Sequence, residues 1–185
     1  MKTGLLPQPK NSTPASKRIA AVALGVLSLV FIIPAVAGIR INESPSLPVG
    51  LYMINDKNGQ LVEFCPAEPF ASLAMRRAYR SAGNCPDGGA PLMKPEVARE
   101  GDIVELSSRG VAVNGKLLPN SAPLRFDTQG RPLEHWRFGR FKVTQGEICV
   151  ISSYNPRSFD SRYIGPVSVA RVRHHLRNLL TFYYF

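Results

Sequence analysis

Three short clusters in this chain carry side chains that could hydrolyse a peptide bond. The first, residues 44–48 (SPSLP), places two serines among prolines. The second is Lys94, which follows two apolar residues and is followed downstream by the pair at 101–102 (GD). The third, residues 155–167 (NPRSFDSRYIGPV), contains further serines and an aspartate. A serine hydroxyl is a poor nucleophile until a base removes its proton, so these clusters raise the question of which residue is the base.

Lysine is a better candidate for that base than histidine. The histidines His135, His174 and His175 lie in polar or arginine-rich surroundings, so a histidine-based triad is the weaker alternative. A lysine can act as a base when burial in an apolar site lowers its pKa far below about 10.4. Four lysines follow residue 41: Lys57, Lys94, Lys116 and Lys142.

The residues next to these lysines in the sequence distinguish the candidates. Lys57 and Lys116 lie beside predicted turns, and Lys142 ends a predicted strand. Lys94 follows Leu92 and Met93, so an apolar setting is plausible for it. Without further information, Lys94 would be interpreted as a surface lysine, and a serine between prolines as a turn residue.

The order and spacing of the clusters resemble the signal peptidase family of Ser/Lys proteases, and within it the TraF-type branch that serves conjugative transfer. That branch carries Ser-x-Pro-x-Gly-x-Tyr, which here is residues 46–52 (SLPVGLY). The most specific match is Ser-x-Asp-Ser-Arg-Tyr-x-Gly-x-Val at residues 158–167. The resemblance covers roughly residues 41–172.

Two positions depart from the general signal peptidase pattern. General signal peptidases have methionine next to the nucleophile and proline three residues after it, whereas here Leu47 is next and Pro48 comes at two. This difference favours the conjugative branch. Glu100 stands where a proline usually precedes Gly-Asp, and we expect it to be a solvated loop residue without effect on catalysis.

The resemblance implies a role for each of five residues. Ser46 would be the nucleophile and Lys94 the general base. Ser44, two residues before the nucleophile, would donate its hydroxyl to the oxyanion hole. Ser158 would orient the lysine, and Asp160 would brace the loop, with Arg162 as its expected partner. For Ser44, Ser158 and Asp160, ordinary loop and turn chemistry remains an alternative.

The implied function is a serine endopeptidase that matures a pilin-type precursor for conjugative transfer. The resemblance also implies that such an enzyme can join the new ends of the pilin into a circle. Two alternatives stay open, a general signal peptidase of broad specificity and a catalytically inactive scaffold of a pilus or secretion complex. Expected partners are the peptide precursor, inner-membrane lipid and the conjugation (type IV secretion) machinery.

Other classes of site and partner are not expected. The net charge is +10, but the sequence has no run of basic residues interleaved with aromatics, which is the pattern typical of nucleic-acid binding. Nucleic acid is therefore not an expected partner. No cofactor is expected, and a zinc site is disfavoured because Cys-x-x-Cys and paired-histidine spacings do not occur in the sequence.

The N-terminal region predicts the compartment. Residues 19–39 carry no charge and, as a helix, would span about 31 Å, which matches a bilayer core. Basic residues before this segment favour a cytoplasmic disordered tail over residues 1–18. A signal peptide cleaved after Ala37 is the alternative. Both readings place residues 40–185 outside the cytoplasm, in the bacterial periplasm at the inner membrane.

The retained anchor would also limit where the site can lie. Ser46 lies seven residues beyond Ile39, a reach of about 25 Å even when fully extended. We therefore expect the site to lie near the membrane surface.

The short strands and turns of the extracytoplasmic part predict a mainly β domain with one short helix, and the resemblance implies that it is a signal-peptidase-like catalytic domain. Residues 51–54 and 61–64 are expected to form a hairpin, and residues 69–80 a helix. Asn114-Gly115 predicts a two-residue turn between strands. Residues 138–143, 148–152 and 167–172 complete the strands. The apolar tail, residues 176–185, is expected either to pack on the body or to lie in the membrane interface.

The three cysteines are consistent with this compartment. Cys65 and Cys85 flank the predicted helix, and outside the cytoplasm such a pair is expected to be oxidised. Cys149, between two β-branched residues, is expected to be a buried free thiol.

Overall fold

The computed structural model describes residues 17–23, 38–57 and 59–182. Residues 17–23 are helical. Among the described residues, no helix has both the length and the apolar composition needed to cross a membrane. Most of the predicted anchor and of the predicted N-terminal tail lies outside the described residues. Residues 39–185 form a compact unit of their own.

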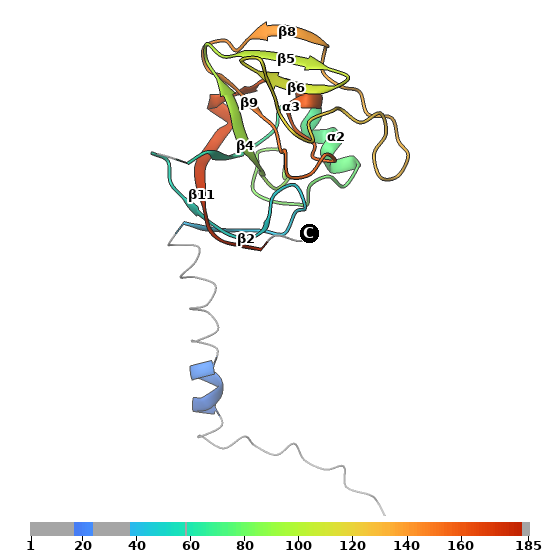
Figure 1. Cartoon of the computed structure of the whole chain (residues 1–185). Coiled ribbons are helices and arrows are strands. Elements are labelled where there is room, and N and C mark those ends of the chain that lie inside the picture. Colours follow the sequence, from blue (N-terminus) through green and yellow to red (C-terminus); the bar gives the residue numbers. More distant parts are fainter. Residues whose placement is uncertain (1–16, 24–37, 58, 183–185) are drawn as a thin grey trace, which may run out of the picture. The chain divides into compact units, whose positions relative to one another are not determined.

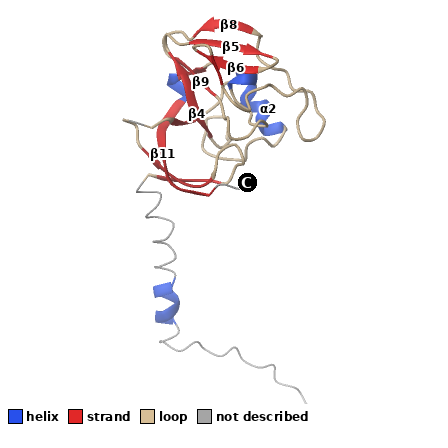
Figure 2. Ribbon diagram, viewed as in Figure 1, coloured by secondary structure: helices blue, strands red, loops and turns tan. Residues whose placement is uncertain are grey.

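Two antiparallel sheets dominate this unit, which confirms the mainly β class (Figures 1 and 2). The seven-stranded sheet has the order β1-β2-β11-β3-β4-β9-β10, and the four-stranded sheet has the order β7-β6-β5-β8. The strands are β1 (Ile39–Asn42), β2 (Val49–Ile54), β3 (Leu61–Phe64), β4 (Leu92–Arg99), β5 (Ile103–Ser107), β6 (Gly110–Val113), β7 (Lys116–Leu117), β8 (Gly139–Lys142), β9 (Glu147–Val150), β10 (Val167–Ser168) and β11 (Val172–Phe182).

The predicted hairpin between residues 51–54 and 61–64 is wrong. Both segments are strands, but β11 lies between β2 and β3 and pairs with each of them. Leu176, near the middle of β11, is opposite Ile54 in one register and opposite Leu61 in the other, and its side chain is fully buried. A strand more than a hundred residues further along the chain is therefore inserted between the two segments, so they do not pair with each other.

The apolar tail thus packs on the body as a central strand as far as Phe182. Figure 1 shows β11 running from the region of β4 and β9 to the end of the unit that holds β2. Its last described part presents exposed apolar side chains at Leu179, Leu180 and Phe182.

The helical content also differs from the prediction. The expected helix over 69–80 is shorter, α2 (Phe70–Arg76), because its C-cap residue Arg77 leaves helical geometry and Ala78 has a positive φ of 55°. A second, one-turn helix, α3 (Ser161–Ile164), precedes β10. The predicted strand over 167–172 is only β10, followed by a 3-10 turn (Val169–Arg171) that leads into β11.

The Asn114-Gly115 turn is present as predicted and joins β6 to β7. Asn114 and Gly115 have φ values of 49° and 81°, the backbone conformation that favours this residue pair in two-residue hairpins. Asn114 also holds the start of β5, because its side chain accepts from Ile103 N and donates to Asp102. The Gly-Asp pair after Lys94 is therefore tied to this turn.

The cysteines pair as predicted. Cys65 and Cys85 form a disulfide, and Cys149 is a buried free thiol whose pKa is raised by burial to about 12. The disulfide ties the end of β3 to the loop over residues 81–90. Arg80 pairs with Asp87 in the same loop at 2.9 Å.

Removing this crosslink is expected to destabilise the unit. The bridge closes a loop with a sequence separation of 20 residues, which corresponds to about 3 kcal/mol in the loop-entropy treatment. Cys65→Ala/Cys85→Ala should therefore lower the urea midpoint. Alkylation in denaturant should label one thiol without reductant and three with it; labelling of all three without reductant would contradict the pairing.

Candidate active site

The Ser46 loop, residues 44–48, connects β1 to β2 and holds the first candidate side chain. Ser46 is only 7% exposed, and its neighbour Leu47 packs into the interior at 4%. Pro45 and Pro48 restrict the backbone on either side of Ser46, because each fixes its own φ and restricts the residue before it. The loop is therefore a rigid segment, as its composition predicts.

Lys94 lies on β4, and tertiary structure brings it to Ser46 from 48 positions away in the chain. Its Nζ is 2.6 Å from Ser46 Oγ. In the sheet Lys94 is opposite Val62 of β3, and only 4% of the residue is exposed. The structure thus brings Ser46 and Lys94 into direct contact.

Pro95, the residue after Lys94, occupies a strand position that lacks a backbone N–H donor. β4 changes partner at this point, pairing with β3 up to Pro95 and with β9 from Glu96. Pro95 still accepts a hydrogen bond from Ile151 N at 3.1 Å. A proline is compatible with this central strand because it stands at the change of partner.

Burial lowers the pKa of Lys94 to about 8. The negative charge of Asp160 opposes this shift, and the positive charge of Arg162 adds to it. Because Asp160 and Arg162 form an ion pair at 2.8 Å, with neither side chain exposed, their effects on Lys94 partly cancel. A neutral amine at this position can accept the proton of Ser46.

Ser44 lies on the other side of the Ser46 hydroxyl. The two Oγ atoms are 2.6 Å apart, and Ser46 N donates to Ser44 Oγ at 3.3 Å. The Ser44 hydroxyl therefore lies beside both the predicted attacking atom and the predicted backbone donor of an oxyanion hole. Its role in that hole stays a prediction.

The third cluster forms a buried network next to Lys94. Arg162 donates to both carboxylate oxygens of Asp160 at 2.8 Å. It also donates to four backbone carbonyls, those of Asn120, Ala122, Pro156 and Ser158. A buried charge that is fully hydrogen-bonded in this way fixes the segments around it.

Ser158 is 3% exposed and lines the same cavity as Ser46 and Lys94. Among the described residues, its Oγ has no hydrogen-bond partner. The hydrogen bond to Lys94 that would orient the amine is thus not formed in this structure, and the orienting role of Ser158 stays a prediction.

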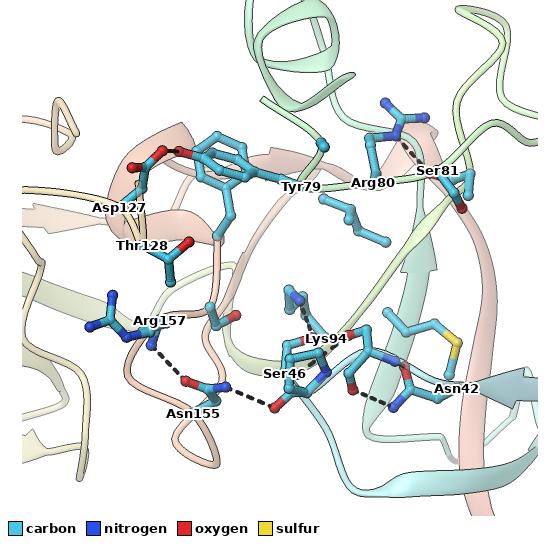
Figure 3. A pocket seen from close by; sticks show the side chains of 18 of the residues that line it. Asn42, Ser46, Tyr79, Arg80, Ser81, Lys94, Asp127, Thr128, Asn155 and Arg157 are labelled. Carbon is cyan, nitrogen blue, oxygen red and sulfur yellow. Dashed lines mark hydrogen bonds between the residues drawn. The ribbon is translucent and has the colours of Figure 1, made fainter. Parts of the chain in front are cut away.

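Ser44, Ser46, Lys94 and Ser158 border a cavity of about 560 Å³. Figure 3 shows Ser46 and Lys94 together on one side of it, with Tyr79 and Asp127 across from them. Apolar side chains, among them Leu92, contribute to its lining. The cavity is large enough for several residues of a peptide. It reaches Ser46 and Lys94, the only serine and lysine side chains of the described residues that are hydrogen-bonded to each other.

Sequence reasoning missed three residues that hold the Ser46 loop. Asn42 donates to carbonyls within the loop, Asn155 donates to Pro45 O at 3.1 Å, and Ser152 donates to Ser46 O. Asn42 lies only two residues before the loop, and a side chain that bonds nearby backbone is ordinary for asparagine. Ser152 and Asn155 gave no such signal, because their contacts cross more than 100 positions of sequence.

Comparison with known proteins is consistent with this geometry. The family described as signal peptidase, peptidase S26, matches residues 15–177. A plasmid transfer protein TraF of Escherichia coli is 37% identical over 172 residues, covering 89% of this chain and 97% of that protein. A probable conjugal transfer protein TraF of Sinorhizobium fredii is 36% identical over 168 residues, covering 86% of this chain and 84% of that protein.

A solved structure is also similar. The crystal structure of a signal peptidase I from Enterococcus faecalis V583 aligns with a TM-score of 0.37 at 20% identity, covering 67% of this chain and 99% of that one. The family assignment rests on the sequence matches and not on this alignment.

Proposed function

This chain belongs to the signal peptidase family, peptidase S26, and we propose that it is a serine endopeptidase in which Ser46 is the nucleophile and Lys94 the general base. The observation that carries the proposal is the 2.6 Å contact between Ser46 Oγ and Lys94 Nζ, both buried at the wall of a cavity. The lowered pKa of Lys94 supports it, because a base must be able to lose its proton near the working pH.

The proposed reaction begins with the proton of Ser46 passing to Lys94 while Oγ attacks the scissile carbonyl carbon. The negative charge on the carbonyl oxygen is met by Ser46 N–H and the Ser44 hydroxyl. The protonated Lys94 then gives its proton to the leaving amine as the C–N bond breaks. The resulting acyl-enzyme is attacked either by water, which completes hydrolysis, or by an amine, which joins two peptide ends.

We propose that the substrate is a pilin-type precursor processed for conjugative transfer. The TraF relatives support this class, since their descriptions name plasmid or conjugal transfer. The substrate would bind as an extended strand. β1 is an edge strand of its sheet, and its residues Ile41 and Asn42 line the cavity next to the Ser46 loop.

We also propose that a segment within residues 19–39 anchors the enzyme in the inner membrane, with the catalytic unit in the periplasm. The Cys65–Cys85 disulfide supports an oxidising compartment. The conjugation machinery would then be a partner on the same side of the membrane.

The substrate class can be tested by intact mass. Membranes containing the enzyme should convert a conjugative pilin precursor into a shorter product, and general secretory precursors should remain uncut. A product lighter than the hydrolysed one by a single water would identify cyclisation. Equal cleavage of both precursor classes would favour a general signal peptidase, and cleavage of neither would favour the inactive scaffold.

A further inference from the structure

The backbone carbonyls of the Ser46 loop, residues 44–48, all accept hydrogen bonds from side chains. Asn42 Nδ2 lies within hydrogen-bond distance of three of them, at 2.9, 3.2 and 3.2 Å, so one of its two N–H groups is shared between two carbonyls. Asn155 donates to the residue before Ser46 at 3.1 Å, and Ser152 Oγ donates to the carbonyl of Ser46 itself. A short loop with every carbonyl held in this way has little freedom to change its backbone angles.

The contact made by Ser152 differs from the others because it acts on the residue that carries the attacking atom. Ser152 follows β9 and is fully buried. Its own N–H donates to Asp160 Oδ2 at 3.0 Å, and Asp160 is held by Arg162 through both carboxylate oxygens. The backbone of Ser152 is therefore held by the most extensively hydrogen-bonded buried ion pair of the described unit, and its hydroxyl is a donor to Ser46.

Through these contacts the Asp160–Arg162 pair is connected to Ser46 by hydrogen bonds that do not involve Lys94. The pair fixes the backbone of Ser152, and Ser152 fixes the carbonyl of Ser46. Lys94 approaches Ser46 from β4, on a different element. The nucleophile is thus held at its backbone from one side and contacted at its hydroxyl from another.

We propose that Ser152 is a positioning residue, which holds Ser46 so that its Oγ faces the scissile carbon while its N–H faces the oxyanion. This inference rests on the proposed function. Attack requires reacting atoms about 3–3.5 Å apart, and a displacement of about 1 Å can cost about 100-fold in rate. A hydroxyl that fixes the Ser46 carbonyl also fixes the adjoining peptide and hence the start of its side chain.

Ser152→Ala tests the proposal in the full-length, membrane-bound enzyme. We expect kcat to fall by about 10- to 100-fold, with KM changed by less than about threefold, because the contact positions the nucleophile and does not touch substrate. The midpoint of the pH–rate profile should stay in place, since no charge near Lys94 changes. Ser152→Cys keeps the shape of the side chain but has a larger atom and only a weak donor, so it should be impaired to a similar degree.

Ser121→Ala is the matched control for loss of a buried serine hydroxyl. Ser121 is 2% exposed, and its Oγ donates to Leu118 O at 2.6 Å and accepts from Val111 N at 2.9 Å, in the four-stranded sheet region. It should lower the melting temperature without changing kcat. If Ser152→Ala lowers only the melting temperature, or if Ser152→Cys is fully active, Ser152 has only a structural role.

The outcomes separate this inference from the function on which it rests. If Ser152→Ala does not accumulate, the near-isosteric Ser152→Cys variant decides the question by its kcat. An active wild type beside a Ser152→Cys enzyme with unchanged kcat overturns the positioning role alone. A folded wild type that cleaves no precursor overturns the proposed function and the positioning role with it.

Discussion

Replacing Ser46 with alanine is expected to abolish precursor processing, with kcat reduced by roughly four to six orders of magnitude, as for other serine nucleophiles. Alanine removes the only atom that can form the acyl-enzyme. The protein should still accumulate, because the Ser46 loop keeps its carbonyl hydrogen bonds from Asn42, Ser152 and Asn155. Single-turnover reactions with purified enzyme, followed by intact mass, measure the effect.

Two serine variants serve as comparisons. Ser108→Ala removes an exposed serine from the turn between β5 and β6 and should leave processing unchanged. Ser44→Ala is more informative, because Ser44 Oγ lies 2.6 Å from Ser46 Oγ. It should retain partial activity, since it removes an oxyanion donor and leaves the nucleophile. If Ser46→Ala were fully active and Ser44→Ala inactive, Ser44 and not Ser46 would be the nucleophile.

The activity of the wild-type enzyme is expected to rise with pH along a single limb with a midpoint near 8. Burial lowers the pKa of Lys94 to about 8, so only about a tenth of the enzyme holds a neutral Lys94 at pH 7. If Lys94 is the base as proposed, the free enzyme should be inactive while Lys94 is charged, so kcat/KM should follow its deprotonation. Lys94→Arg should be inactive, because a guanidinium keeps its proton throughout this range.

Lys94→His and Lys142→Ala sharpen this test. Histidine is shorter than lysine, but any remaining activity should show its limb displaced toward acid. Lys142, exposed on β8 of the four-stranded sheet, is the other lysine with apolar neighbours, Phe141 and Val143, and its replacement should leave the profile unchanged. An active Lys94→Arg enzyme, or a dead Lys142→Ala beside a normal Lys94→Ala, would refute the assignment of the base.

The lowered pKa of Lys94 also predicts that this residue destabilises the folded protein. In the folded state the pKa of Lys94 is lowered to about 8, whereas in the unfolded chain it is about 10.4. The unfolded chain therefore binds more protons between these values, and stability rises with pH across that window. Below pH 8 the buried charge costs about 3 kcal/mol. Lys94→Met should be inactive yet more stable than wild type at neutral pH, as measured by its melting temperature.

The strand order shows where local patterns stop being informative. Residues 51–54 and 61–64 are correctly predicted as strands, because each is a short, mostly apolar run next to turn residues. Their pairing is wrong, because a six-residue connection is compatible both with a hairpin and with an inserted strand. The choice depends on β11, whose apolar residues also suggested a membrane-interface tail.

The helix over residues 69–80 illustrates a boundary error of the same origin. Apolar spacing predicted helix through Arg80, but the Arg80 side chain is buried against Asp87 and Ala90 O. The helix ends at Arg76, because Arg77 leaves helical geometry and Ala78 has a positive φ. The chain then turns into the disulfide-linked loop that holds Arg80, and apolar periodicity does not encode this turn.

The sequence by itself determined the types of residue that can do the chemistry and the family to which the chain belongs. The family resemblance predicted roles for Ser46 and Lys94, which the structure brings into contact. The cysteine positions and the predicted compartment predicted the disulfide. Asn114-Gly115 predicted a turn at its own position, because turn chemistry depends mainly on adjacent residues. Tertiary structure decided the properties on which the proposed activity depends. Lys94 is buried beside β3 and 48 positions from Ser46, and this burial lowers its pKa. The hydrogen bond to the Ser46 carbonyl comes from Ser152, and that to the Pro45 carbonyl from Asn155, each more than 100 positions away. Contacts of that range follow from how the whole chain packs, and no local pattern encodes them.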